Sequence, residues 1–138
     1  MGDYLMSLIK ANDLTNVTGG IPTVKSQQLI PTAWVNFNGS AVSIRGSENV
    51  SSITDGGVGQ YRVNLSITLA NTNYAISVTG TGANTSSGQC QLDSLSWGGS
   101  GEITGMTTTS FNIRGSNGGS PISNSDHQNV NAIVMGGQ

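Results

Sequence analysis

Charged side chains are scarce in this sequence. Asp, Glu, Lys and Arg make up 9% of its 138 residues, against roughly 25% in an average soluble domain. The basic residues are scattered and the formal net charge is −2, so the chain lacks the basic groove with which many proteins bind nucleic acid. We therefore expect no nucleic-acid partner.

Cysteine and long hydrophobic runs are also scarce. Cys90 is the only cysteine, so no disulfide can form within the chain. No stretch approaches the roughly 20 apolar residues that cross a bilayer, and the first residues lack the pattern of a signal peptide. We expect a protein that is made and assembled in a cytoplasm and is not inserted into a membrane.

Side chains that support catalysis or metal binding are few. His127 is the only histidine, and a Ser-His-acid triad would depend on it. It follows Asp126 in a polar segment, where we expect an ordinary solvated or hydrogen-bonded histidine. The alternative is a metal ion held by three copies of His127 around a threefold axis.

Paired carboxylates could hydrolyse a glycan if two of them stood roughly 5–10 Å apart. Asp55 falls in a glycine-rich turn, where an acid usually accepts hydrogen bonds from backbone N–H groups. The remaining candidates are not adjacent by strand spacing: Glu48, Asp93, Glu102 and Asp126. We expect no enzymatic activity, no cofactor and no bound metal.

Apolar residues recur at every second position from residue 32 onward. Ala33, Val35 and Phe37 form one such set, and Tyr61, Val63, Leu65 and Ile67 form another. Shorter patterns of the same kind span about 42–44, 48–54, 73–79, 89–97, 107–114 and 130–134. They predict about eight strands in an all-β domain, an antiparallel β-sandwich or a jelly-roll-like domain. The glycines of segment 55–59 predict a hairpin between strands 48–54 and 60–68.

Residues 1–30 differ from the rest and predict a short extended or partly helical N-terminal arm before a domain of residues 31–138. Gly19, Gly20 and Pro22 end any helical pattern. The arm is either a disordered terminus or an anchor for the domain. The anchor interpretation depends on its apolar residues: Leu5, Met6, Leu8, Ile9 and Leu14.

Two long polar segments, 80–88 and 116–126, interrupt the strands. They are either solvated connections or loops that contact a glycan or protein partner, because loops vary without disturbing strands. The contact hypothesis depends on residues with short amide or hydroxyl groups: Asn84, Thr85, Ser86, Asn117, Ser120 and Asn124.

The two tryptophans receive different interpretations. Trp34 lies within a dense strand pattern and is expected in the core, whereas Trp97 lies beside a glycine run and is expected either in the core or at a surface or subunit interface. Hydrophobic residues make up only 35% of the chain, against about 45–50% in typical domains. A lone domain would bury a lean core, so oligomerisation is expected to supply further burial.

Two motifs carry a resemblance to a known family. Trp34-Val35-Asn36-Phe37-Asn38-Gly39, followed by Asn49-Val50-Ser51-Ser52-Ile53-Thr54-Asp55-Gly56-Gly57-Val58-Gly59-Gln60-Tyr61, resembles a domain of tail-fibre proteins of tailed bacteriophages. The resemblance covers residues about 31–138 and is strongest over 33–80. It implies a small β-domain that forms homotrimers near the host-facing part of a fibre. It also implies structural roles, in the core for Trp34, Phe37, Val50, Ile53 and Tyr61, and in turns and edges for Asn36, Asn49 and Asp55.

The resemblance predicts a virion protein, a short tail fibre or tail-tip adhesin that residues 1–30 attach to phage tail or capsid proteins. The alternative is a structural virion component without receptor binding, such as a head fibre, a capsid decoration or a tail-adaptor protein. In the family this domain usually follows hundreds of residues of shaft. Here it begins after about thirty.

Overall fold

The computed structural model describes residues 23–24, 27–28, 30–82, 89–92, 105–116 and 124–137. The chain divides into two compact units, Met1–Ile30 and Pro31–Gln138. In the first unit, β1 (Thr23–Val24) pairs antiparallel with β2 (Gln27–Gln28). The predicted helical turns around Leu5 to Leu14 lie outside the described residues.

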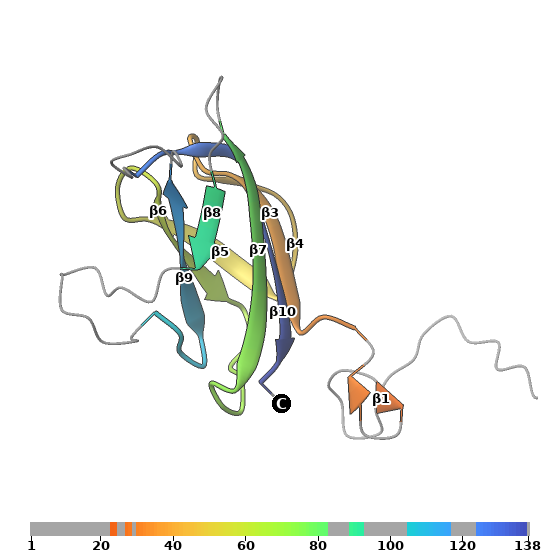
Figure 1. Ribbon diagram of the computed structural model, residues 1–138. Helices are drawn as coiled ribbons and strands as arrows, with labels where there is room; N and C mark the ends of the chain where they lie inside the picture. The colour runs from red at the N-terminus through yellow and green to blue at the C-terminus, as the bar shows by residue number, and fades with distance from the viewer. Residues whose placement is uncertain are drawn as a thin grey trace, which may run out of the picture. The chain divides into compact units, whose positions relative to one another are not determined.

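The second unit consists of two four-stranded sheets packed face to face (Figure 1). The first sheet has the order β4-β3-β10-β7, with bounds Ser43–Glu48, Ala33–Asn38, His127–Gly136 and Tyr74–Gly82. The second has the order β5-β6-β9-β8, with bounds Val50–Asp55, Gln60–Leu65, Ser110–Ser116 and Gln89–Leu92. Neighbouring strands are antiparallel throughout, and the described residues contain no helix. The predicted antiparallel β-sandwich is confirmed.

The chain crosses from the first sheet to the second through one residue, Asn49. β4 and β5 are edge strands of the two sheets, and Asn49 alone separates them. Its φ of 56° is left-handed, a conformation that asparagine tolerates better than most residues. Its side-chain Nδ2 also donates to the backbone oxygen of Thr32 over 2.7 Å. The strand predicted from residue 48 therefore begins at Val50.

The predicted hairpin is present between β5 and β6. Gly57 and Gly59 have φ values of 110° and 65°, which glycine adopts without steric cost. Asp55 Oδ1 accepts a 2.8 Å hydrogen bond from Gly57 N, so this carboxylate serves the turn as expected.

The core forms where the inward-facing residues of the two sheets meet. Phe37 and Tyr61 pack edge to face across the sandwich, with ring centroids 5.2 Å apart at 76°. Val50 and Ile53, expected in the core, are partly buried and pack against it. The buried hydrophobic residues are Ala33, Val35, Phe37, Tyr61, Val63, Leu65, Leu69, Tyr74, Phe111, Ile113, Val130, Ala132 and Val134.

Tyr74 joins the core to the segment before β9. Its hydroxyl donates toward the backbone oxygens of Thr107, at 2.8 Å, and Ser110, at 3.2 Å. Burial raises the pKa of Tyr74 above its ordinary value of 10.0.

Candidate functional site

The two polar segments expected to contact a host leave the sandwich at the same end. Gly82, the last residue of β7, pairs with His127, the first residue of β10. Gln89, the first residue of β8, pairs with Ser116, the last residue of β9. The segments that follow Gly82 and Ser116 therefore depart from neighbouring strand ends.

Two tight turns close the same end, which we call the loop end. After β3, Gly39 N donates to the backbone oxygen of His127 over 2.8 Å, and Gly115 N donates to the backbone oxygen of Gly59 over 2.7 Å. The loop end thus combines the β3–β4 turn, the β5–β6 hairpin and the strand ends from which the two long polar segments leave.

Pro31, where the β-domain begins, lies at the opposite end. The next residue, Thr32, donates its backbone N–H to Val134 O over 2.8 Å and its Oγ1 to Gly136 O over 2.7 Å. Both acceptors lie among the last three residues of β10, at the opposite end of that strand from His127. The chain that precedes the domain therefore joins it at the end remote from the loop end.

Among the residues expected to contact a host, the structure describes Asn124. It forms an antiparallel bridge with Ser116, and its Oδ1 accepts a 2.6 Å hydrogen bond from Arg114 Nε. Asn124 thus fixes the base of its segment. The other expected contact residues lie outside the described part of the chain: Asn84, Thr85, Ser86, Asn117 and Ser120.

His127 is buried within the chain, so of the two expected environments, solvated or hydrogen-bonded, it has the hydrogen-bonded one. Its side chain is 0% exposed, and its Nε2 donates to Ser116 O over 3.1 Å. Its Nδ1 has no hydrogen-bond partner among the described residues. Gly115 makes room for the ring, since a Cβ there would stand 2.6 Å from His127 Cδ2. The metal alternative requires an exposed ring, whereas the ring of His127 is enclosed within the single chain.

Asp126 holds the hairpin against the start of β10. Its Oδ1 accepts hydrogen bonds from Gly59 N at 2.7 Å and from the Tyr61 hydroxyl at 2.9 Å. Both described carboxylates near turns, Asp55 and Asp126, therefore bind groups of the fold. Asp93, Glu102 and Trp97 lie outside the described residues.

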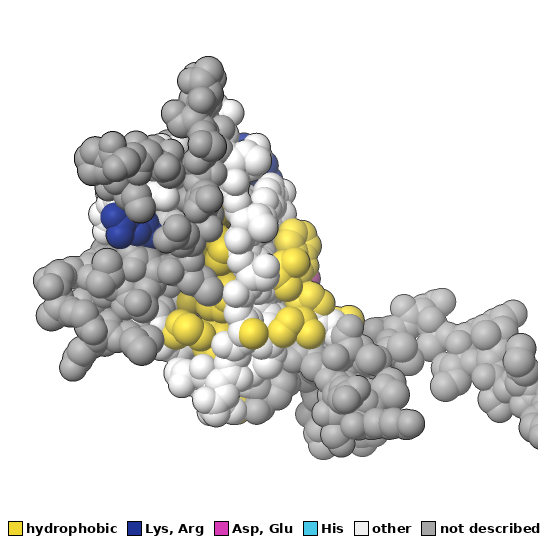
Figure 2. All heavy atoms as spheres, viewed as in Figure 1, with side chains coloured by type: hydrophobic (Ala, Val, Ile, Leu, Met, Phe, Trp, Pro, Cys, Tyr) yellow, Lys and Arg dark blue, Asp and Glu magenta, His cyan; other side chains and the backbone are white. Residues whose placement is uncertain are grey.

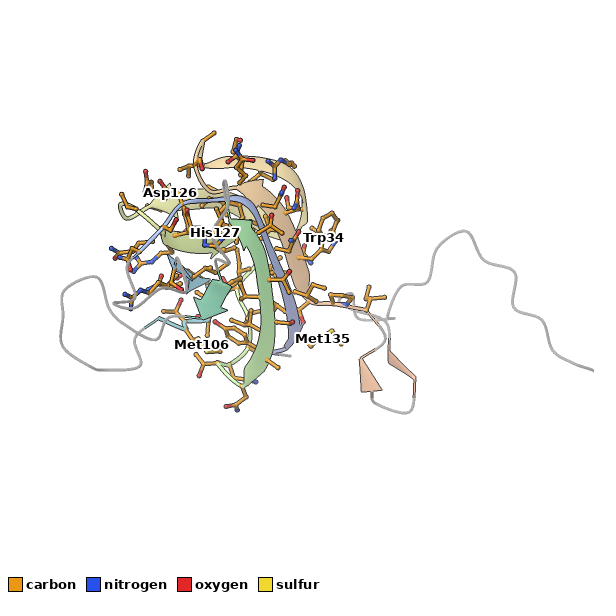
Figure 3. The ribbon with its side chains drawn as sticks, turned by 45° about the horizontal axis from the view of Figure 1, so that its top comes forward. Trp34, Met106, Asp126, His127 and Met135 are labelled. Carbon is orange, nitrogen blue, oxygen red and sulfur yellow. The ribbon has the colours of Figure 1, made fainter. Side chains whose placement is uncertain are left out.

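The outward face of the first sheet carries the second candidate site. Trp34, expected in the core, points outward instead, with 41% of its side chain exposed. Figure 3 shows Trp34 and Met135 on the outer side of this sheet, while His127 lies between the layers. Strand alternation explains the correction: Ala33 and Val35 face inward, so Trp34 must face outward.

Trp34 lies in a row of exposed residues across the sheet. It pairs with Glu48 on β4 and with Ile133 on β10. Ile133 is 46% exposed, and Met135, two residues further along β10, is 38% exposed. Figure 2 shows hydrophobic side chains at the surface on the side of the domain where this sheet lies.

Beyond this apolar region, two rows of polar side chains cross the same face. Asn36 Nδ2 donates to Asn131 Oδ1 over 2.6 Å, and Asn131 Nδ2 donates to Thr79 Oγ1 over 3.4 Å. Asn36 was expected at a turn or edge, but it lies on the inner strand β3 because β4 covers that edge.

The second row runs parallel to the first. Arg45 Nη1 donates to Asn129 Oδ1 over 2.6 Å, and Asn129 Nδ2 donates to Thr81 Oγ1 over 3.0 Å. Arg45 also approaches the backbone oxygen of Phe37 at 3.4 Å. A register shift between Asn36 and Phe37 lets Arg45 reach across β3 to β10. We call these side chains, together with Trp34 and Glu48, the outer face.

Across the described ranges no three His, Cys, Asp or Glu side chains are grouped so as to hold a metal ion. Likewise, no helix in that part of the chain is long and apolar enough to span a membrane.

Comparisons with protein-family models, with curated proteins and with solved structures found no match to this chain.

Proposed function

We propose that this chain is a virion protein of a tailed bacteriophage, a short tail fibre or tail-tip adhesin. Residues 1–30 attach it to phage tail or capsid proteins, the β-domain forms a homotrimer, and the domain contacts a glycan or protein of the host surface. The protein is synthesised in the bacterial cytoplasm and resides in the virion.

One observation supports this proposal: Pro31 and the loop end lie at opposite ends of the domain. Pro31 lies at the end of β10 that Thr32 binds through Val134 and Gly136, whereas the two polar segments leave near His127 and Ser116. A domain anchored through residues 1–30 would hold its polar loops away from the point of attachment. Loops on a rigid scaffold are where binding residues are commonly found.

The motif residues support the same proposal through their structural roles. Phe37 and Tyr61, one from each motif, form the aromatic contact between the sheets. Asn49 and Asp55 make the sheet crossing and the hairpin turn. The two motifs that resemble the tail-fibre domain therefore build one connected part of the sandwich.

The test replaces residues 83–88 and 117–123 each by a short Gly-Ser turn, leaving β7, β9 and Asn124 intact. If the chain is an adhesin, the variant protein should still enter particles, as measured by antibody labelling, but phage adsorption should fall. Thr68→Ala, an exposed change outside the loop end, serves as the control. Normal adsorption by particles that carry both replacements would favour a structural virion component instead.

A further inference from the structure

We propose that the outer face of the β4-β3-β10-β7 sheet binds a neutral sugar ring, which stacks on Trp34 and hydrogen-bonds to the neighbouring amide row. This site rests on the proposed adhesin function and gives it a ligand class. It is separate from the loops on which that function was first argued.

Trp34 lies across the sheet instead of standing out from it. A Cβ built on Gly46 would meet Cη2 and Cζ3 of Trp34 at 3.3 and 3.4 Å. These atoms are at the far end of the indole, and Gly46 lies on the neighbouring strand β4. The ring therefore spans from β3 to β4. Because 41% of the side chain is exposed, this arrangement leaves an aromatic surface open to solvent.

The amide row next to Trp34 has a defined direction. Asn36 donates to Asn131 and Asn131 donates to Thr79, so all the donors point from β3 toward β7. At the start of this row, no described hydrogen bond uses the amide oxygen of Asn36, which lies two residues from Trp34 on the same face of β3. Side chains already held by hydrogen bonds lose little conformational freedom when a ligand binds.

A sugar ring matches this combination of surfaces. Its C–H groups form an apolar patch that packs on an indole, and its hydroxyls both donate and accept hydrogen bonds, as side-chain amides do. Glu48, the strand partner of Trp34, is exposed and offers a carboxylate acceptor. A carboxylate beside the platform disfavours an anionic sugar, so we assign a neutral hexose.

Gly46 provides a test that keeps Trp34 in place. Gly46 does not have a positive φ, so alanine fits its backbone, but the new Cβ would press on the indole at 3.3 Å. Gly46→Ala should thus displace the platform without removing it. Trp34→Ala removes the platform, and Thr68→Ala is the matched control outside this face.

The experiment is a titration of the full-length protein, followed by ¹H–¹⁵N NMR, with methyl β-glucoside, methyl β-galactoside and N-acetylglucosamine. We expect at least one sugar to shift the Trp34 indole N–H and the Asn36 and Asn131 amide signals saturably. In Trp34→Ala the sugar should no longer shift the amide signals of Asn36 and Asn131. Gly46→Ala should weaken binding about tenfold. Thr68→Ala should leave binding unchanged.

Two results would overturn the site. If none of the three sugars shifts these signals at concentrations up to their solubility, the face does not bind neutral hexoses. If Trp34→Ala instead dissociates an oligomer, the face is a contact between copies of this chain. Neither result decides the adhesin proposal, which depends on particle labelling and on adsorption by the loop variants.

Discussion

The side chain of Asn49 donates a hydrogen bond to the backbone oxygen of Thr32 over 2.7 Å. Asn49 is the single residue through which the chain passes from one sheet to the other, and Thr32 immediately precedes β3. This bond therefore ties the sheet crossing to the start of the domain. The backbone of Asn49 also supports the crossing, because Ser66 N donates to Asn49 O over 3.0 Å.

Replacing Asn49 separates its two contributions. Asn49→Gly keeps the left-handed backbone and loses the side-chain bond, which should cost about 0.5–1.5 kcal/mol. Asn49→Ala loses the same bond and also strains the left-handed backbone, which should lower the free energy of unfolding by about a further 1–2 kcal/mol. Urea unfolding followed by circular dichroism measures both. Equal stability of the two variants would show that the φ of Asn49 carries no cost for alanine.

Gly115→Ala should destabilise the loop end by steric overlap. The new Cβ would stand 2.5 Å from Ser125 O and 2.6 Å from His127 Cδ2, and overpacking of this kind costs about 1–3 kcal/mol. Gly57→Ala is the comparison, because Gly57 has positive φ but nothing within 4 Å of its Cβ position. An unchanged melting temperature for Gly115→Ala would contradict the described packing around His127.

Stability should fall at alkaline pH in part through Tyr74. Its pKa in the folded protein is raised above 10.0 by burial, so the folded state retains its proton more strongly than the unfolded state. This contribution is fully present below pH 10 or so and is lost as pH rises through the raised pKa. Tyr74→Phe should be less stable at neutral pH, because the hydroxyl donation shared between Thr107 O and Ser110 O is lost, but its stability should decline less steeply above pH 10.

Chemical unfolding at closely spaced alkaline pH values tests this difference between wild type and Tyr74→Phe. The comparison cancels the titration of groups common to both proteins. Parallel pH profiles would show that Tyr74 does not titrate differently in the folded and unfolded states.

The purified protein should form a homotrimer, as its resemblance to tail-fibre domains implies, and its composition favours association. The chain is only 35% hydrophobic and 9% charged, so a lone domain has a lean core and few solubilising charges. Light scattering on dilute protein measures its mass directly. A stable monomer at micromolar concentration would contradict the expected trimer.

Strand alternation was sufficient to predict most of the sandwich. Ala33, Val35 and Phe37 face the core, and the hairpin glycines at 57 and 59 have positive φ. Both features depend on residues that are close in sequence, so a local sequence pattern is enough to predict them. The same alternation placed Trp34 outward, and the size of its side chain led to the wrong expectation that it was buried.

The environment of His127 could not be predicted in this way. Its burial depends on the pairing of β10 with β7, on the backbone of Ser116 in the other sheet and on the missing side chain of Gly115. These groups meet only after the sheets pack. The polar rows of the outer face have the same origin, because Asn36, Asn131 and Thr79 come from three strands that are distant in sequence.

Competition for adsorption tests the central claim most directly, that this protein contacts the host surface. The measurement adds purified full-length protein to host bacteria before the phage that carries it and follows the rate at which free phage disappears. The account predicts that the protein binds the cells and slows adsorption as its concentration rises, and that the variant lacking residues 83–88 and 117–123 competes less well. Adsorption that proceeds at its normal rate, with no protein bound to the cells, would contradict it.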